Sequence, residues 1–278
     1  MKRRPLNQAL VDAGLCEDSK QAAAWVMAGR VLVNGQPARA GMFLRPDDQL
    51  RLKNQLPYAS KGGLKLAGAL SAFRLDVSGL VCLDAGASTG GFADCLLQHG
   101  ARLVYAVDVG FGQLTGTLRQ DSRVVNLERT NLSDPRLLTL EPTPVFATCD
   151  LSYLSLRDAV PIYQGILGNQ GQLVALVKPL FEVDDSQARR SGQLQDQAYA
   201  PLLRDLSAWL NGLEDVRVLQ VCESPVRGSA GTLEFFFHLV FGGGQAQVDL
   251  EDDIRRSVAR ALAINVDTKA GDTAFEQV

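Results

Sequence analysis

Seven short apolar runs, separated by segments with helical spacing, restrict the fold of this chain more than any other feature of its sequence. The runs lie near residues 79–84, 102–107, 123–126, 145–149, 171–177, 215–223 and 233–241. Strands that alternate with helices predict a doubly wound α/β sheet, which binds ligands at the carboxyl ends of its central strands. About nine residues join the last two runs. Because that is too short for a helical crossover, we expect this pair to be antiparallel.

An otherwise parallel seven-stranded sheet with one reversed strand near its edge resembles the Rossmann-like methyltransferases more than the dehydrogenases.

The 278 residues exceed the usual size of one domain, and 46% hydrophobic residues are ample for a core. No run approaches the roughly 18 apolar residues of a membrane span, and no apolar stretch follows the basic start as in a signal peptide. We therefore expect a two-domain protein of the cytosol.

The cysteines and histidines limit the available chemistry. Five cysteines are scattered and never spaced as Cys-x-x-Cys, which fits neither a disulfide framework nor a zinc site. His99 and His238 are far apart in the sequence, so neither a histidine-centred triad nor a metal centre is expected. The chemistry must then use Lys, Asp, Glu, Ser or a cofactor, and we expect the cysteines to be reduced core residues.

Charge is unevenly distributed along the chain. Residues 1–65 contain eleven Lys and Arg residues against five acidic residues, a net charge of +6. The remaining residues sum to −9, because the total is −3. A basic module on an acidic body indicates a polyanionic partner bound by one end of the molecule. A merely soluble basic surface would give the same distribution.

The basic segment also predicts a small α+β domain. Apolar residues recur at helical spacing over Leu6–Leu15 and Asp18–Ala28, and strands are expected around 30–36 and 47–52, the first entering an Asn-Gly turn. This run resembles the S4 RNA-binding domain, although it opens with Arg-Pro-Leu-Asn where the S4 pattern has Arg-Leu-Asp. The resemblance implies phosphate contacts, which position RNA more than they read its sequence. These contacts would fall on Arg3, Arg4, Lys20 and Arg30.

A glycine-containing loop after the first apolar run predicts a site for a nucleotide-containing cofactor. Its glycines permit a tight turn and a close approach of the backbone at the start of a helix. The dinucleotide fingerprint G-x-G-x-x-G would need glycine in place of Ser88. Asp108 ends the next strand, about 20 residues on, where a carboxylate can accept both ribose hydroxyls of an adenosine cofactor. NAD and S-adenosylmethionine both present that ribose, so Asp108 does not distinguish between these two cofactors. The candidate cofactor residues are Asp84, Gly86, Ser88, Gly90, Gly91, Phe92 and Asp108.

Four ionisable residues occupy positions where surface charges are not expected. Lys65 lies near the start of a helix predicted over 62–73, and Asp150 and Lys178 follow two apolar strands. Glu234 opens the last strand. Strand ends of a doubly wound sheet converge on one crevice, so these side chains could share it. For any one of them alone, an isolated ion pair or capping charge would be the simpler interpretation.

Six motifs together identify a family. They are LDAGASTGGF at 83–92, DVGFGQL at 108–114, LERTN at 127–131, DLSYLSL at 150–156, VKPLFE at 177–182 and GTLEF at 231–235. From about residue 3 to 265 the chain resembles the TlyA-type rRNA methyltransferases, whose catalytic domain is similar to the FtsJ 2'-O-methyltransferases. The resemblance implies S-adenosylmethionine as cofactor, ribosomal RNA as substrate and methylation of a ribose 2'-hydroxyl, by resemblance that of cytidine.

The family's Lys-Asp-Lys-Glu tetrad falls, by this resemblance, on Lys65, Asp150, Lys178 and Glu234. A 2'-hydroxyl is a poor nucleophile until its proton is removed, and a lysine can be the base only where burial or a neighbouring cation favours its neutral form. Lys178 would be that base and Lys65 the neighbouring cation. The two carboxylates would hold the ammonium groups. Methyl transfer is then an in-line displacement that needs no metal and depends on positioning.

Three features depart from the family pattern. Leu180 stands where glutamine is common, Lys61 replaces a common arginine, and the segment 183–196 lacks the usual glycine-rich character. Because of these departures, the family pattern does not predict the form of the substrate-facing loop or the identity of the target nucleotide. The predicted division is an S4-like domain at 1–53, a linker at 54–61, a methyltransferase domain at 62–265 and a polar tail at 266–278.

Three other functions are weighed against methyl transfer. A catalytically silent RNA-binding protein is opposed by the complete tetrad. A haemolysin would need a membrane segment or a strongly amphipathic cationic helix, which the sequence lacks. An NAD-dependent oxidoreductase is disfavoured by Ser88, and it would have no use for the lysines and carboxylates at the strand ends. The sequence does not predict an oligomeric state.

Overall fold

The computed structural model describes residues 3–16, 18–53, 56–183, 186–228, 231–242 and 248–264, with the side chains of Ser186 and Gln187 left aside. The described residues form two compact units that divide between Leu56 and Pro57. Asn54 and Gln55 of the predicted linker, and the predicted tail at 266–278, lie outside the described residues.

The N-terminal unit is a small α+β fold. Its elements are β1 (Arg4–Pro5), α1 (Leu6–Asp12), α2 (Ser19–Met27), β2 (Val31–Val33), β3 (Gln36–Pro37), β4 (Phe43–Leu44) and β5 (Leu50–Leu52). Asp18 caps α2 by accepting a 2.7 Å hydrogen bond from the Gln21 N–H. The Asn34-Gly35 pair turns β2 into β3 with φ angles of 52° and 78°. Both helices and this turn agree with the sequence pattern, whereas the antiparallel β1–β4 pair was not predicted.

The C-terminal unit contains a seven-stranded sheet within the described residues, in the order β11-β12-β10-β9-β6-β7-β8. The strands are β6 (Val81–Ala85), β7 (Leu103–Asp108), β8 (Val124–Glu128), β9 (Phe146–Cys149), β10 (Gln172–Val177), β11 (Val216–Glu223) and β12 (Phe235–Phe241). Strand β12 runs antiparallel to both β10 and β11, and the other strand pairs are parallel. The prediction of a mostly parallel sheet with one reversed strand near its edge is confirmed.

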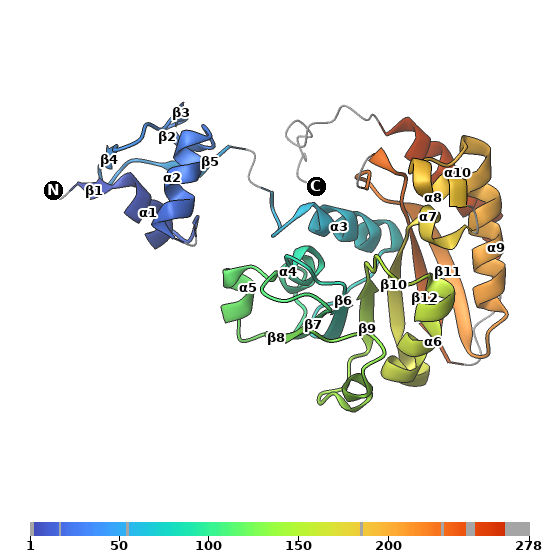
Figure 1. Cartoon of the computed structure of the whole chain (residues 1–278). Helices are drawn as coiled ribbons and strands as arrows, with labels where there is room; N and C mark the ends of the chain where they lie inside the picture. The colour runs from blue at the N-terminus through green and yellow to red at the C-terminus, as the bar shows by residue number, and fades with distance from the viewer. Residues whose placement is uncertain are drawn as a thin grey trace. The chain divides into compact units, whose positions relative to one another are not determined.

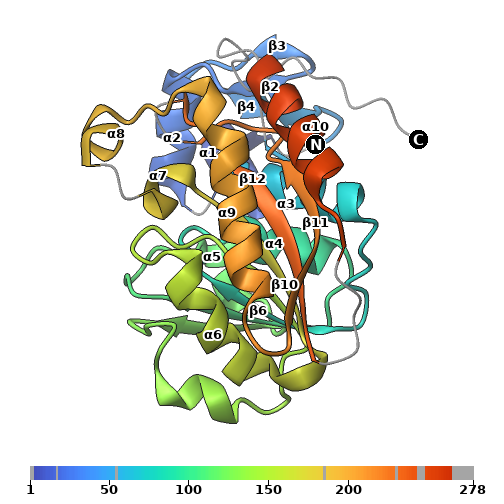
Figure 2. The same ribbon diagram turned by 90° about the vertical axis from the view of Figure 1, so that its right-hand side faces the viewer.

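Helices cover both faces of this sheet, as Figure 1 shows. One core cluster joins the sheet to α3 (Lys61–Phe73), α4 (Gly91–Gln98) and α5 (Gly116–Gln120). The other joins it to α6 (Leu156–Leu167), α9 (Tyr199–Asn211) and α10 (Glu251–Ala263), with α9 and α10 side by side over β11 in Figure 2. The remaining short helices are η1 (Pro135–Thr139), η2 (Gly168–Gln170), α7 (Pro179–Glu182), α8 (Ser186–Ser191) and η3 (Asp196–Ala198).

The segment at the start of the C-terminal unit is bound to α4. The Ala59 N–H donates to Asp94 Oδ2 at 2.7 Å, and the Gln98 side chain donates to the Pro57 carbonyl at 2.8 Å. Ser60 then caps α3, accepting from the Gly62 N–H at 3.3 Å. The segment that leads into α3, which carries Lys65, is therefore fixed against α4.

The cysteines are all buried and unpaired, as expected from their spacing. His238 is buried in β12 between the side-chain oxygens of Gln172 and Gln220, at 3.0 and 3.3 Å. Burial lowers its pKa to about 4. A search of the described residues finds no helix that is both long and apolar enough to cross a membrane.

Candidate active site

The loop between β6 and α4 passes close to the end of β9. Gly86 has a φ of +87°, and a Cβ there would lie 2.4 Å from the backbone oxygen of Asp150. The Gly86 N–H in turn donates to the Val107 carbonyl at 2.9 Å. Only glycine fits this position, because a side chain would be strained by its φ and would collide with backbone. The close approach places the loop directly beside Asp150.

Asp108, at the end of β7, holds the same loop. Its Oδ2 accepts from the Ser88 N–H at 2.8 Å, and its Oδ1 accepts from the Gly110 N–H at 2.7 Å. Ser88 has a φ of 48°, in the left-handed region, and its hydroxyl donates to Gln113 at 3.2 Å. Ser88 therefore adopts a left-handed backbone conformation that favours glycine, at the position where the dinucleotide fingerprint has its second glycine.

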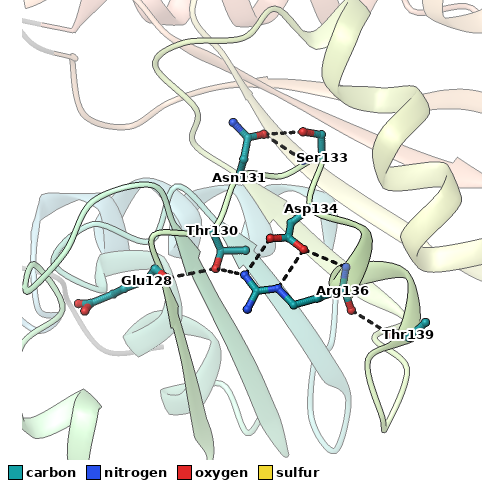
Figure 3. Close-up of polar contacts among 7 residues, drawn as sticks. All are labelled: Glu128, Thr130, Asn131, Ser133, Asp134, Arg136 and Thr139. Atoms are coloured by element: carbon teal, nitrogen blue, oxygen red, sulfur yellow. Dashed lines mark hydrogen bonds and ion pairs between the residues drawn. The ribbon is translucent and has the colours of Figure 1, made fainter.

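The loop after β8 is held by a compact set of polar contacts (Figure 3). The Thr130 hydroxyl donates to the Glu128 carbonyl at 3.1 Å and accepts from the Arg136 guanidinium at 3.3 Å. Arg136 also pairs with Asp134 at 2.8 Å. Thr130 is only 2% exposed and faces the cavity beside Asp108. Within the LERTN motif, Thr130 is therefore the residue that lines this cavity.

The two lysines of the predicted tetrad each pair with one of its carboxylates. Lys65 Nζ lies 2.5 Å from Glu234 Oε2, although 169 residues separate them. Lys178 Nζ lies 2.6 Å from Asp150 Oδ1 and donates to the Ser152 hydroxyl at 2.9 Å. Burial raises the pKa of the Glu234 carboxyl, and the nearby ammonium groups of Lys65 and Lys178 oppose that rise. The two pairs therefore act on one another electrostatically.

Two adjoining cavities open on one member of each ion pair, Lys65 and Asp150. The larger, about 390 Å³, is bordered by Lys65 and Asp150 and by the start of α3. The smaller, about 210 Å³, is bordered by Asp108 and also by Asp150. Both share the walls formed by Gly86 and Ser88. An elongated ligand could therefore pass along the loop from Asp108, past Asp150, to Lys65.

The structure distributes the candidate cofactor residues unevenly. Gly86, Ser88, Gly91, Phe92 and Asp108 border one or both cavities. Among the residues that the structure describes, Asp84 and Gly90 border neither. Asp84 is fully buried under the loop, where it accepts a 2.8 Å hydrogen bond from the Thr148 hydroxyl, and Gly90 caps α4.

Sequence reasoning missed several residues of the site. Ser152 contacts Lys178, and Ser60 borders the larger cavity. Gly228 passes so close to Glu234 that a Cβ would collide with its carboxylate. Arg227 borders the same cavity while its guanidinium donates to the backbone carbonyls of Gly231 and Ile264. The DLSYLSL motif contained the signal for Ser152, but Arg227 and Gly228 lie in no motif of the sequence.

The four predicted RNA contacts lie on the N-terminal unit. Arg3, Arg4, Lys20 and Arg30 are all exposed there. Arg4 lies 3.7 Å from Asp12, an exposed and therefore weak ion pair. The guanidinium and ammonium groups are thus accessible to a polyanion from solvent.

The sheet order and the strand-end loop define a Rossmann-like α/β protein of the methyltransferase type. Residues 58–241 match the FtsJ-like methyltransferase family, and residues 4–50 match the S4 domain. The family match covers more than half of the chain. The chain belongs to the FtsJ-like methyltransferase family, among its TlyA-type members.

Individual relatives are similar over nearly the whole chain. "Putative rRNA methyltransferase YqxC" of Bacillus subtilis is 39% identical, with 94% of each chain covered. "16S/23S rRNA (cytidine-2'-O)-methyltransferase TlyA" of Mycobacterium tuberculosis is 36% identical, covering 93% of this chain and 98% of the relative. The solved structure "Putative hemolysin from Streptococcus thermophilus" has a TM-score of 0.70 and 37% identity, covering 95% of this chain and 97% of the other.

Replacing Gly86 with alanine should disturb this site while leaving the rest of the fold in place. The new Cβ would push against the Asp150 backbone, so we expect a loss of about 1–3 kcal/mol in unfolding free energy and at least about tenfold weaker cofactor binding. Denaturant unfolding and titration calorimetry measure the two effects. Gly79→Ala is the matched control, because Gly79 has a similar φ of +73° but no atom within 4 Å of the added Cβ. Equal effects of the two substitutions would contradict the steric argument.

Proposed function

We propose that this chain is an S-adenosylmethionine-dependent 2'-O-ribose methyltransferase that acts on ribosomal RNA. The proposal rests mainly on two ion pairs, Lys65–Glu234 and Lys178–Asp150. They lie beside a cavity that is lined by the glycine-containing loop between β6 and α4. Its relative from Mycobacterium tuberculosis is named for cytidine-2'-O methylation of 16S and 23S rRNA. We therefore propose cytidine as the target nucleotide.

The residues around the two cavities fit S-adenosylmethionine. The Asp108 carboxylate would hold the ribose hydroxyls, and the backbone from Gly86 to Gly91 would line the rest of the cofactor. Gly86 and Ser88 support this fit because they line both cavities, and the absence of a Cβ on Gly86 lets the loop lie against the Asp150 backbone. When bound, the cofactor supplies a methyl group on a sulfonium centre. Thermal shifts with S-adenosylmethionine and with NAD test the choice, since a ligand that binds the folded state raises its melting temperature. Stabilisation by NAD alone would favour an oxidoreductase instead.

Lys178 is the proposed general base, with its amine accepting the proton of the ribose 2'-hydroxyl. Asp150 and Ser152 orient Nζ through the contacts at 2.6 and 2.9 Å. Lys65 is a second cation of the proposed site, and Glu234 holds it in place through the ion pair between Lys65 Nζ and Glu234 Oε2. The four charges cancel when both lysines are protonated, which limits the cost of placing them in a partly buried site.

The proposed RNA-binding element is the S4-like domain at 1–53, joined by the linker 54–61 to the methyltransferase domain at 62–265. Its exposed basic residues would contact phosphates and so dock the substrate without reading its sequence. The segment 183–196 is proposed to face the substrate, and Asp184 and Asp185 within it lie outside the described residues.

The test of this function is methyl transfer from labelled cofactor to isolated 30S and 50S ribosomal subunits, followed by nuclease digestion to identify the modified nucleoside. We expect label in a 2'-O-methylcytidine. A wild-type chain that binds the cofactor but labels neither subunit would support the catalytically silent RNA-binding protein. Label on a base instead of a ribose would refute the proposed chemistry.

Replacing Arg3, Arg4, Lys20 and Arg30 together with alanine should weaken RNA binding and leave cofactor binding unchanged. Each lost phosphate contact should reduce the slope of log affinity against log salt concentration by about 0.7 to 0.9. Filter binding at several salt concentrations measures this slope. Arg102→Ala with Arg255→Ala, two exposed positions of the catalytic unit, is the control. An unchanged slope in the quadruple variant would place the RNA contacts elsewhere.

A further inference from the structure

The VKPLFE motif carries an acidic residue, Glu182, that the proposed chemistry does not use. Lys178 stands near its start, and Glu182 ends the short helix α7 that follows. Glu182 Oε1 accepts a hydrogen bond of 2.8 Å from the Leu156 backbone N–H. Glu182 Oε2 is buried and has no hydrogen-bond partner among the described residues. The carboxylate therefore makes a specific contact outside the active-site cavities.

Leu156 is the first residue of α6, directly after the loop that carries Asp150 and Ser152. The first N–H groups of a helix have no acceptor within the helix, so they need one from elsewhere. Ser155 accepts from the Asp158 N–H at 3.3 Å, and Glu182 satisfies the N–H of Leu156. Negative charge is also favourable at the positive end of the helix dipole.

The electrostatic surroundings agree with this contact. Burial raises the pKa of the Glu182 carboxyl, and the hydrogen bond from Leu156 opposes the rise. The positive charge of Arg157 also lowers its pKa, whereas Asp158 raises it. The carboxylate is thus held in place by α6 against the cost of its burial.

The loops after β9 and β10 are consequently joined at two points. At one, Lys178 contacts Asp150 and Ser152. At the other, Glu182 contacts Leu156. A base must stand within hydrogen-bond reach of the proton that it removes, so the relative position of these two loops controls catalysis.

We propose that Glu182 is a positioning residue of the active site, which fixes the loop after β10 against the start of α6 and so keeps the Lys178 amine beside Asp150. The inference rests on the proposed role of Lys178 as the base. It extends the site to a carboxylate that borders neither of the two cavities among the described residues.

The test compares full-length Glu182→Ala, Glu182→Gln and a control, Ile166→Val, which trims a buried residue near the other end of α6. We expect Glu182→Ala to lower kcat by about tenfold, because small displacements of a catalytic group have large effects on rate. The KM for S-adenosylmethionine should stay within about twofold. Glu182→Gln should retain kcat within about threefold, because its amide oxygen can still accept the Leu156 N–H.

A second measurement follows the position of Lys178 without using activity. Brief treatment with acetic anhydride, read by peptide mass spectrometry, gives the acetylation of Lys178 relative to Lys65. We expect this ratio to rise in Glu182→Ala and to stay at the wild-type value in Glu182→Gln and Ile166→Val. A higher ratio in Glu182→Ala with an inactive wild type would overturn the proposed function and uphold the positioning role. An unchanged ratio, or a kcat for Glu182→Ala equal to that of Ile166→Val, would overturn the positioning role.

Discussion

Replacing Lys178 with alanine should lower kcat for methyl transfer by about 10²- to 10⁴-fold, the usual contribution of a general base. The substitution removes the amine that contacts Asp150 and Ser152. Lys178 borders neither cavity among the described residues, so the dissociation constant of S-adenosylmethionine should change by less than about threefold. Single-turnover transfer to ribosomal subunits measures the rate, and calorimetry measures cofactor binding.

Lys178→Arg distinguishes the role of Lys178 as a base from its role as a positive charge. A guanidinium keeps the charge that pairs with Asp150, but it cannot be deprotonated in a protein. We therefore expect Lys178→Arg to be nearly as inactive as Lys178→Ala. Substantial activity in the arginine variant would mean that Lys178 acts as a fixed cation, and activity within tenfold of wild type in the alanine variant would remove it from the mechanism.

Replacing Asp84 with asparagine should stabilise the protein at alkaline pH. Asp84 is fully buried, and burial raises its pKa to about 7, although the hydrogen bond from Thr148 opposes the rise. Asparagine keeps a side-chain oxygen that can accept from Thr148 and carries no charge. The variant therefore avoids the cost of a buried carboxylate above neutral pH.

The pH window of this effect follows from the two pKa values of Asp84. Between about pH 4 and pH 7 the folded state binds a proton at Asp84 that the unfolded state does not. The contribution of this group to stability is thus present below the unfolded pKa and is lost as pH rises through about 7. Between pH 5 and pH 8 the unfolding free energy of the wild type should fall by about 2 to 3 kcal/mol relative to that of Asp84→Asn.

The quantity to measure is the difference in unfolding free energy between variant and wild type, obtained by urea denaturation at pH 5 and at pH 8. The wild-type profile alone is insufficient because His238 acts in the opposite direction. Its pKa is lowered to about 4, so its contribution is present above the unfolded pKa and is lost as pH falls from about 6.5 to 4. A variant-to-wild-type difference that is the same at both pH values would show that Asp84 is ionised in the folded state throughout.

The sheet could be predicted because its physical cause is local in the sequence. Each strand of a sheet covered on both faces is a continuous apolar run, and each of the seven runs became a strand. The linker length between the last two runs also settled their antiparallel pairing. The β1–β4 pair was missed because two-residue strands have no periodicity to detect.

The chemical types at the strand ends were likewise visible in the sequence, since Asp108, Asp150 and Lys178 each follow an apolar run. The residues that these and the other site residues contact could not be read from the sequence. The contact between Lys65 and Glu234 spans 169 residues, and the one between Glu182 and Leu156 spans 26 residues. No local pattern encodes which strand ends lie side by side, because sheet order depends on how the helices cross over.

By itself the sequence determined the class of fold, the family and the residue types available for catalysis. The tertiary structure alone decided which carboxylate pairs with which lysine. It also decided that Asp84 lies beneath the loop between β6 and α4 while Asp108 borders a cavity. Both acids belong to strands of the same sheet, and a motif records that a carboxyl group is present without recording its exposure. Exposure and pairing depend on the packing of distant segments, and that packing exists only once the chain is folded.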